Sequence, residues 1–383
     1  MQRIPAKPVP ALARQAAAGG SGSSGAGPGR AKEAVAGVLM AAPVILLLLT
    51  FLITPFLLAF GMAFTNQRLI SPNPTAYVGA RNFNQLLTLR PLLLDPLIDP
   101  DSGRVLRDDS GAATYPALRT LTRNNPDFPH LAGLRELASW QWGERRLYLL
   151  ASDVVFMRAL GNTLLFVLVV APTQATLALV LALLINQPLR GINVFRTIYF
   201  MPVVISLVVV SLLWRFIYSP GGLLNSLLAW LTFGNFTPID WLGNPATALG
   251  AIMAMSIWQA VGFHMVIWLS GLQTIPGVLY EAAEVAGANA WQKFRYVTWP
   301  GLRNTAVLVL VVITMQAFAL FTQIDVMTRG GPRDATQSIV FQAVQRGFER
   351  QDIAGGSAIS VVLFLIVLSV SLLQRYVTRE RAP

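Results

Sequence analysis

The sequence predicts an all-α polytopic membrane protein with six transmembrane helices and one cytoplasmic helical loop between the fourth and fifth of them. Two observations lead to this fold class. First, 54% of the 383 residues are hydrophobic and only 12% are charged, which is too apolar for an ordinary soluble domain. Second, six apolar runs divide the chain: a longer first run and five runs that are each near the ~20 residues that a bilayer requires. Because hydrocarbon offers no partners to backbone polar groups, we expect each run to be helical.

The first transmembrane helix is expected over residues 34–64, where no charged residue occurs and Pro43 and Pro55 interrupt the run. The run is too long for the apolar region of a signal peptide. It follows residues 1–33, whose Ala, Gly, Ser and Pro content predicts a disordered tail. The other runs lie in a transmembrane core of residues 156–377, at 159–185, 197–218, 246–272, 305–324 and 354–377, and a short tail (378–383) follows.

The distribution of charge predicts how the spans are oriented. With Arg375, the connecting segments on one side hold 13 Lys and Arg residues against 4 acidic ones, whereas the other side holds 14 Arg against 14 acidic residues. The positive-inside rule makes the first side cytoplasmic. Both termini and the 273–302 loop are therefore expected inside the cell. The net charge of +11 is better explained by this orientation than by nucleic-acid binding. The cytoplasmic segments are 1–33, 186–196, 273–304 and 378–383.

Several kinds of chemistry find no support in the sequence. The chain has no Cys, and its two His, His130 and His264, are far apart and form no HExxH metal signature. None of the three lysines lies in a phosphate-binding GxxxxGK[ST] loop. We therefore expect a non-catalytic subunit without a metal or cofactor of its own. If ATP drives its function, another subunit binds the nucleotide.

The polar stretch of residues 280–300, YEAAEVAGANAWQKFRYVTWP, stands between two apolar runs. It predicts two short helices with a sharp bend: one over 277–286, a left-handed residue at Gly287, and a second helix capped by Asn289. Pro300 then leads into the next apolar run. Small alanines and paired carboxylates fit a docking surface, but from physics alone an amphipathic loop lying on the membrane is the favoured interpretation.

The same stretch resembles the EAA loop of permease subunits in binding-protein-dependent ABC importers. The matching residues are Glu281-Ala282-Ala283, then Gly287, then the segment ending in Pro300. Val297 and Trp299 depart from the Ile and Leu of the family pattern, and Ala286 replaces a frequent acidic residue.

Further motifs resemble the carbohydrate branch of that family, typified by maltose and glycerol-3-phosphate importers. They are ALGNT at residues 159–163, GLLN at 222–225 and TRGGP at 328–332. Residues 89–150, within the exterior loop 65–155, form an insertion that relatives replace by a short linker. We interpret it as a small exterior subdomain, which either contacts a solute-binding protein or is a neutral surface insertion.

The resemblance implies an inner-membrane subunit that transports a carbohydrate or polyol-type solute delivered by an external binding protein. It implies a second permease subunit and two ATPase subunits, which bind ATP and Mg²⁺. The helices of residues 280–300 would dock on one ATPase, so that Glu281, Ala282, Ala283, Gly287 and Pro300 transmit its closure.

Polar side chains inside the later spans are candidates for a substrate path. Such groups are costly in hydrocarbon and usually face a cavity or a neighbouring helix. Amide and imidazole groups beside aromatic rings suit a sugar, and hydrogen bonding between spans is the simpler interpretation for any one of them. The candidates are Gln259, His264, Gln316, Phe318 and Gln323.

Other functional classes make different predictions for the same residues. A channel or proton-coupled carrier predicts acidic residues in the spans, and the apolar runs contain none between their ends. A membrane-embedded enzyme requires paired carboxylates, metal ligands or a nucleophile beside a base, and the spans show no such spacing. A permease-like scaffold that recruits an ATPase, or an importer subunit for a non-sugar solute, stays open as the alternative.

Overall fold

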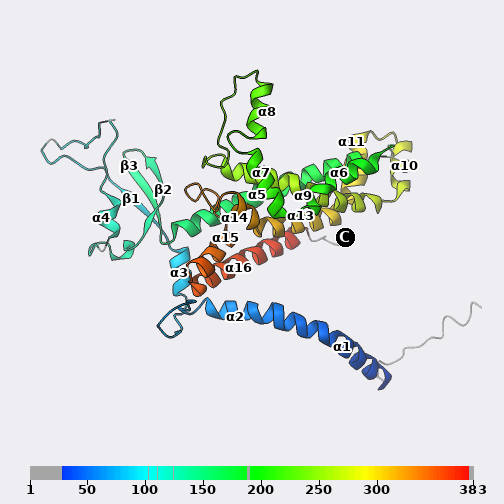
Figure 1. Ribbon diagram of the computed structural model, residues 1–383, viewed down its shortest axis with the longest axis horizontal. Helices are drawn as coiled ribbons and strands as arrows, with labels where there is room; N and C mark the ends of the chain where they lie inside the picture. Colours follow the sequence, from blue (N-terminus) through cyan, green and yellow to red (C-terminus); the bar gives the residue numbers. More distant parts are fainter. Residues whose placement is uncertain (1–27, 102, 110, 124, 188–189, 379–383) are drawn as a thin grey trace, which may run out of the picture. The chain divides into compact units, whose positions relative to one another are not determined.

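A computed structural model describes residues 28–378 except 102, 110, 124, 188 and 189 (Figure 1). The chain divides into two compact units, Met1–Leu58 and Ala59–Pro383. Most of the two expected tails, residues 1–33 and 378–383, lies outside the described residues.

The first unit contains a long apolar helix with a single π-helical turn inside it. Helix α1 covers Pro28–Leu48, the π turn η2 covers Leu49–Ile53, and α2 (Thr54–Met62) continues into the second unit. The irregular turn ends two residues before Pro55, which lacks a backbone donor. There the Thr54 hydroxyl donates to the Leu49 carbonyl at 2.8 Å. The part long and apolar enough to cross a membrane is Ala36–Met62, and the helix begins ahead of the expected boundary at residue 34.

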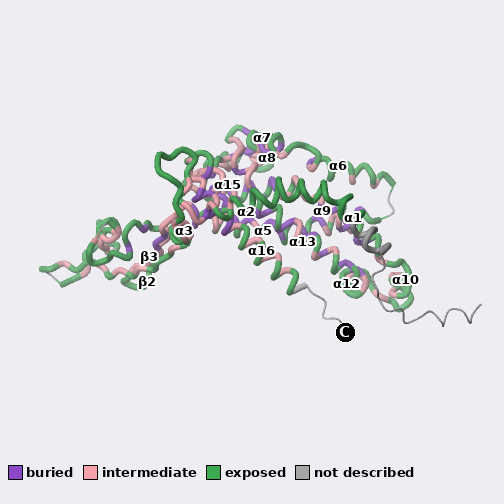
Figure 2. Tube along the Cα trace, turned by 90° about the horizontal axis from the view of Figure 1, so that it is seen from below, coloured by how far each residue is buried: buried purple, intermediate pink, exposed green. Residues whose placement is uncertain are grey.

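Four long helices form the core of the second unit and lie side by side in Figure 1. Figure 2 shows buried positions along α5, α9 and α13. Alanines recur at helical spacing on α5 and share a buried cluster with Trp268 and Leu272 of α9: Ala171, Ala175, Ala178 and Ala182. Their small side chains let the two backbones approach closely. The four helices are α5 (Val154–Ile185), α9 (Ala248–Gln273), α13 (Arg303–Phe318) and α16 (Ile353–Thr378).

The expected helix over residues 197–218 is broken, so the prediction of one continuous span there is wrong. Helix α6 (Ile192–Val204) meets α7 (Leu207–Ile217) at an angle of 98°. Pro202 lies in the last turn of α6 and cannot donate a helical hydrogen bond, and Ile205 is extended.

The expected span over residues 305–324 is also not one helix. Helix α13 ends at Phe318, and α14 (Thr322–Met327) follows a break. Before α13, the helical stretch Ala290–Gly301 enters at a bend of 69°. In the described residues four helices are long and apolar enough to cross a membrane, or up to six if each bent pair is one span.

The chain is mostly helical but not all-α, because the second unit contains a three-stranded antiparallel sheet of order β1-β3-β2. The strands are β1 (Leu89–Leu94), β2 (Arg135–Trp142) and β3 (Arg145–Ala151). Leu131, Leu134, Tyr148 and Leu150 form a small core under the sheet. The prediction failed because it followed long apolar runs, whereas these strands are short and half-buried. A hairpin signal was present at Gly143, which has φ +63° between β2 and β3.

Short helices connect the long ones. Before α5 and after α7 these are α3 (Arg81–Leu87), α4 (Leu118–Thr122), the 3₁₀ turn η3 (Pro129–Leu131) and α8 (Leu223–Leu231). Helix α15 (Ile339–Val344) and the π turn η5 (Gln345–Glu349) precede α16.

One arginine joins the starts of two long helices. Arg346 in η5 contacts Asp153 through Nη1 at 2.9 Å and Asp352 through Nε at 2.8 Å. Asp153 is the N-cap of α5 and accepts from the Phe156 N–H, and Asp352 accepts from the Gly355 N–H at the start of α16. Because both carboxylates also satisfy helix-terminal donors, this guanidinium fixes the relative position of α5 and α16.

We predict that Gly262→Ala on α9 destabilises the fold. A Cβ at this position would lie 1.9 Å from the Tyr199 carbonyl oxygen of α6, so the two helices must separate. The expected loss is about 1–3 kcal/mol, as for other overpacked sites. Thermal unfolding of the detergent-purified chain measures it, and Gly250→Ala, on the same helix with open space around it, is the matched control. Equal unfolding temperatures for the two variants would contradict the close approach.

We also predict that Arg346→Met lowers the unfolding temperature, because it leaves two partly buried carboxylates without their shared cation. Hydrogen bonds to charged groups suggest a loss of about 1–3 kcal/mol, reduced by the partial exposure of the pair. Arg350→Met serves as control, since Arg350 is exposed and its guanidinium bonds the Gln345 side chain at 3.3 Å. If both variants unfold alike in the same detergent, the role assigned to Arg346 is wrong.

Candidate functional site

A cavity of about 370 Å³ lies within the second unit, between α5, α9 and the helices near them. Its polar lining consists of four glutamine amides and two hydroxyl groups, and two phenylalanine rings lie beside them. These residues are Gln174, Gln259, Gln316, Gln323, Ser256, Thr322, Phe166 and Phe263. No charged side chain occurs among the described residues that line it. The cavity thus offers hydrogen-bond donors and acceptors without net charge.

The structure brings three of the five predicted path residues to this cavity. Gln259 reaches it from α9, Gln316 from α13 and Gln323 from α14. The break between α13 and α14 contributes here, because it places Gln323 on a helix separate from Gln316. Phe318, in contrast, is buried and is not among the lining residues.

His264 lies one layer behind the cavity and supports its wall. The ring is fully buried, and its Nδ1 lies 2.8 Å from Nε2 of Gln174 and 2.9 Å from the Ala260 carbonyl oxygen. Gln174 itself lines the cavity from α5, and Ala260 lines it from α9. The imidazole therefore connects two walls of the cavity rather than facing its interior.

Sequence reasoning did not select Ser256, although a periodic signal pointed to it. On α9, Gln259 and Ala260 lie three and four residues after Ser256, and Phe263 lies four and three residues after them, so the four residues share one face of that helix. Ser256 is buried, and its hydroxyl has no hydrogen-bond partner in the part of the chain that the structure describes. A solute hydroxyl in the cavity could form a hydrogen bond with the Ser256 hydroxyl.

The polar stretch between α9 and α13 has the expected helix–bend–helix form. Helix α10 covers Gly277–Val285, and Gly287 takes the left-handed conformation with φ +74°. Asn289 then caps α11 (Ala290–Lys293) in a reciprocal box with Gln292. A π turn η4 (Phe294–Thr298) and α12 (Trp299–Gly301), which contains Pro300, lead on to α13. These local predictions are confirmed.

Two side-chain contacts hold the short helices together. Lys293 Nζ lies 2.7 Å from Glu284 Oε1, and the hydroxyls of Tyr280 and Thr298 lie 3.0 Å apart. Glu281, Ala282 and Gly287 are exposed, and Ala283 is partly exposed. Glu284 therefore contributes to the shape of the element, whereas Glu281 stays available to a partner.

Apolar side chains project from the same element. Val285 is 92% exposed, Tyr296 is 73% exposed and Trp291 is 67% exposed. Exposed apolar side chains of this size on α10, α11 and η4 form a surface of the kind that marks an interaction site.

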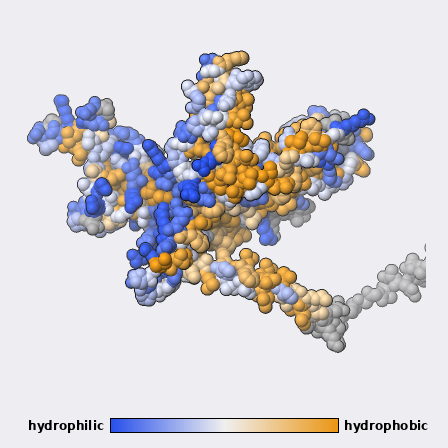
Figure 3. All heavy atoms as spheres, viewed as in Figure 1, coloured by the Kyte–Doolittle hydropathy of each residue, from blue (hydrophilic) through white to orange (hydrophobic). Residues whose placement is uncertain are grey.

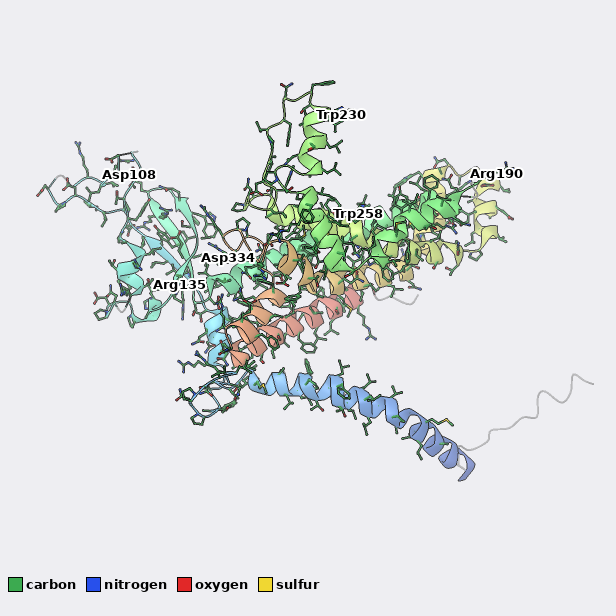
Figure 4. All side chains as sticks on the ribbon, viewed as in Figure 1. Asp108, Arg135, Arg190, Trp230, Trp258 and Asp334 are labelled. Carbon is green, nitrogen blue, oxygen red and sulfur yellow. The ribbon has the colours of Figure 1, made fainter. Side chains whose placement is uncertain are left out.

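Two sequence motifs far apart in the chain meet at the start of α5. Asn162 donates to the carbonyls of Asp334 and Gln337, and the Thr163 hydroxyl accepts from the Ile339 N–H at 3.0 Å. The ALGNT segment at residues 159–163 and the loop that begins with TRGGP are thus parts of one contact. Figure 4 marks Asp334 where that loop approaches α5.

Comparison with known proteins gives one family. Residues 149–382 match the family described as binding-protein-dependent transport system inner membrane component. The chain is 34% identical over 244 residues to the lactose transport system permease protein LacF of Rhizobium radiobacter, covering 62% of this chain and 81% of that protein. It is also 34% identical over 220 residues to the trehalose/maltose transport system permease protein MalF of Thermococcus litoralis, covering 57% of this chain and 73% of the relative.

A solved structure shares the fold. The crystal structure of a bacterial ABC transporter involved in the import of the acidic polysaccharide alginate matches with a TM-score of 0.66 at 20% identity. The match covers 92% of this chain and 98% of the other. At this identity the likeness shows the fold alone.

Proposed function

Because the chain belongs to the family of binding-protein-dependent transport system inner membrane components, we propose that it is the membrane-spanning subunit of an ATP-driven importer for a carbohydrate or polyol-type solute. The observation that carries the substrate class is the uncharged, amide-lined cavity. The names of the lactose and trehalose/maltose relatives support the same class.

The cavity suits a neutral polyhydroxylated solute. Each amide both donates and accepts hydrogen bonds, as a sugar hydroxyl does, so four amides match many hydroxyl arrangements. The rings of Phe166 and Phe263 offer apolar surface to the C–H face of a sugar. A volume of about 370 Å³ falls in the usual range of roughly 300–1,000 Å³ for ligand pockets. An anionic solute would meet no cation there.

We place the six spans, including both bent pairs, across the inner membrane with both termini in the cytoplasm. The excess of basic residues on the side of residues 273–304 supports this orientation. The sheet of β1, β2 and β3 then lies outside the cell membrane, where an external solute-binding protein would dock.

The exposed helices α10 and α11 are the proposed coupling element. Apolar groups such as Val285 and Trp291 would be covered by a groove on an ATPase subunit, which binds ATP and Mg²⁺. Closure of two such ATPases would move this element and rock the spans of this chain against a second permease subunit. The bend at Gly287, with the packing of Ala282, Ala283 and Pro300, would transmit the motion.

We predict that Gly287→Leu uncouples ATP hydrolysis from uptake while membrane insertion is retained. Nothing lies within 4 Å of a Cβ at this position, so the cost is conformational: φ +74° strains a non-glycine residue by about 1–2 kcal/mol. The bend then shifts and the element no longer fits its partner. Uptake and ATPase activity of the reconstituted transporter measure this effect.

Two control variants separate the effect of the backbone conformation at Gly287 from the effect of adding a side chain to this element. Gly277→Ala lies on the same element, also in open space but without positive φ, and should transport normally. Gly287→Asn should retain most activity, since asparagine tolerates the left-handed conformation. Normal uptake by Gly287→Leu would contradict the coupling role proposed for Gly287.

We further predict that Gln259→Leu and Gln316→Leu each raise the KM for uptake. Each change removes one or two hydrogen bonds worth about 1 kcal/mol each, which corresponds to a roughly 5- to 30-fold effect. Radiolabelled-sugar uptake into proteoliposomes measures it. Gln273→Leu is the matched control, because Gln273 ends the same helix as Gln259 but is exposed and away from the cavity. Equal KM values for all three variants would exclude the cavity as the substrate path, while leaving the coupling experiment unaffected.

A further inference from the structure

The loop between α7 and α9 carries a short helix whose apolar side has no partner in the described chain. Helix α8 and the residues around it contain no charged side chain from residue 216 to residue 239. Its large side chains are exposed: Leu223 is 67%, Trp230 is 74% and Phe233 is 95% exposed. Exposed aromatic and aliphatic groups in such density indicate a contact surface.

The base of α8 is fixed to the core of the second unit. Asn225 is buried, and its amide nitrogen donates to the carbonyls of Ser219, Pro220 and Ile239. Its amide oxygen accepts from Nε1 of Trp241 at 2.9 Å. These bonds join the two arms of the loop at the base of α8, and Leu224 and Trp241 pack this base against the buried cluster of the bundle.

Its depth is set by contacts at the start of α9. The Tyr218 hydroxyl, at the end of α7, donates to the Ala251 carbonyl in the first turn of α9 at 2.9 Å. The Trp241 and Tyr218 rings lie 6.5 Å apart, so the loop returns at the same level. In the proposed topology this is the outer end of the spans, where the hydrocarbon meets the headgroups.

Figure 1 shows α8 projecting sideways from the bundle formed by α5, α9 and α13. A helix of nine residues is about 14 Å long at 1.5 Å per residue. Figure 4 shows Trp230 near the far end of α8, away from the bundle. Figure 3 shows hydrophobic surface on the flank of α8 that faces along the bundle toward α6 and α10, whereas the opposite flank is more polar. The apolar flank is thus turned toward the depth at which hydrocarbon surrounds the spans.

We propose that α8 is an interfacial helix that lies in the outer leaflet of the membrane, with Leu227, Trp230 and Phe233 inserted among the acyl chains. The absence of charge, the tryptophan and phenylalanine at its free end and the direction of its apolar flank are typical of interface-lying segments. The helix anchors the bent α6–α7 span at a fixed depth. This role rests on the proposed orientation of the spans and does not depend on which solute is carried.

The chain suits a direct test because it contains no cysteine. Single variants Leu227→Cys, Phe233→Cys and Thr237→Cys carry a nitroxide label in the full chain, reconstituted in phosphatidylcholine vesicles with some phosphatidylglycerol. Thr237 is exposed on the returning arm of the same loop and is the water-facing control. Collisions of each label with oxygen, which partitions into lipid, are compared with collisions with a water-soluble nickel chelate.

The expected result is that labels at positions 227 and 233 collide more often with oxygen than with the nickel chelate. The label at position 237 should collide more often with the nickel chelate. The pattern should persist when the second permease and ATPase subunits are added. Nickel access at all three positions would overturn the proposal in favour of a water-exposed loop. Loss of oxygen access at Leu227 and Phe233 on assembly would overturn it in favour of a subunit interface.

Discussion

Hydrogen-bond satisfaction in an environment without water is the constraint on which the rest of this structure depends. A polar group in hydrocarbon must find its partner inside the protein. Trp268 of α9 donates to the Ala175 carbonyl of α5 at 3.1 Å, and Gln374 of α16 donates to the Thr314 hydroxyl of α13 at 2.9 Å. The same requirement joins Gln174 to His264. Of the polar residues that the sequence suggests as functional, some therefore form hydrogen bonds between helices and others line the cavity.

Close approach of backbones is the second requirement, because aliphatic side chains alone gain little from leaving lipid for a neighbouring helix. The alanines of α5 and Gly262 of α9 supply it. The helices then separate around the cavity, where α6 turns away into α7 and α13 gives way to α14. The break between α13 and α14, which the apolar pattern does not show, brings Thr322 and Gln323 to the cavity. Gln174, Ser256 and Gln259 reach it from unbroken helices.

The sequence motifs that resemble those of the family make specific hydrogen bonds and ion pairs in the structure. Asn162 and Thr163 hold the loop that begins with TRGGP by satisfying its backbone groups. Arg346 joins the N-termini of α5 and α16 in the same region. Segments separated by more than a hundred residues therefore form one junction at the starts of α5 and α16. Between α10 and α11, Lys293 pairs with Glu284 across the bend at Gly287, so the acidic residue missing at Ala286 is not required for the shape of this segment.

The sequence by itself determined the features that depend on local composition and spacing. Apolar runs located the long helices, although their ends moved by several residues, and Gly287 and Asn289 predicted the bend and the cap because these are properties of single residues. Only the tertiary structure decided which of Gln259, His264, Gln316, Phe318 and Gln323 face the cavity, because each lies on a helix whose rotation is set by its neighbours. It also decided the pairing of β1 with β3, which are distant in the chain, and the 98° angle at the break near Pro202, because a proline ends a helix without setting the direction of the next one. The local sequence pattern determines which secondary structure a segment can form, and packing against neighbouring helices determines where its side chains point.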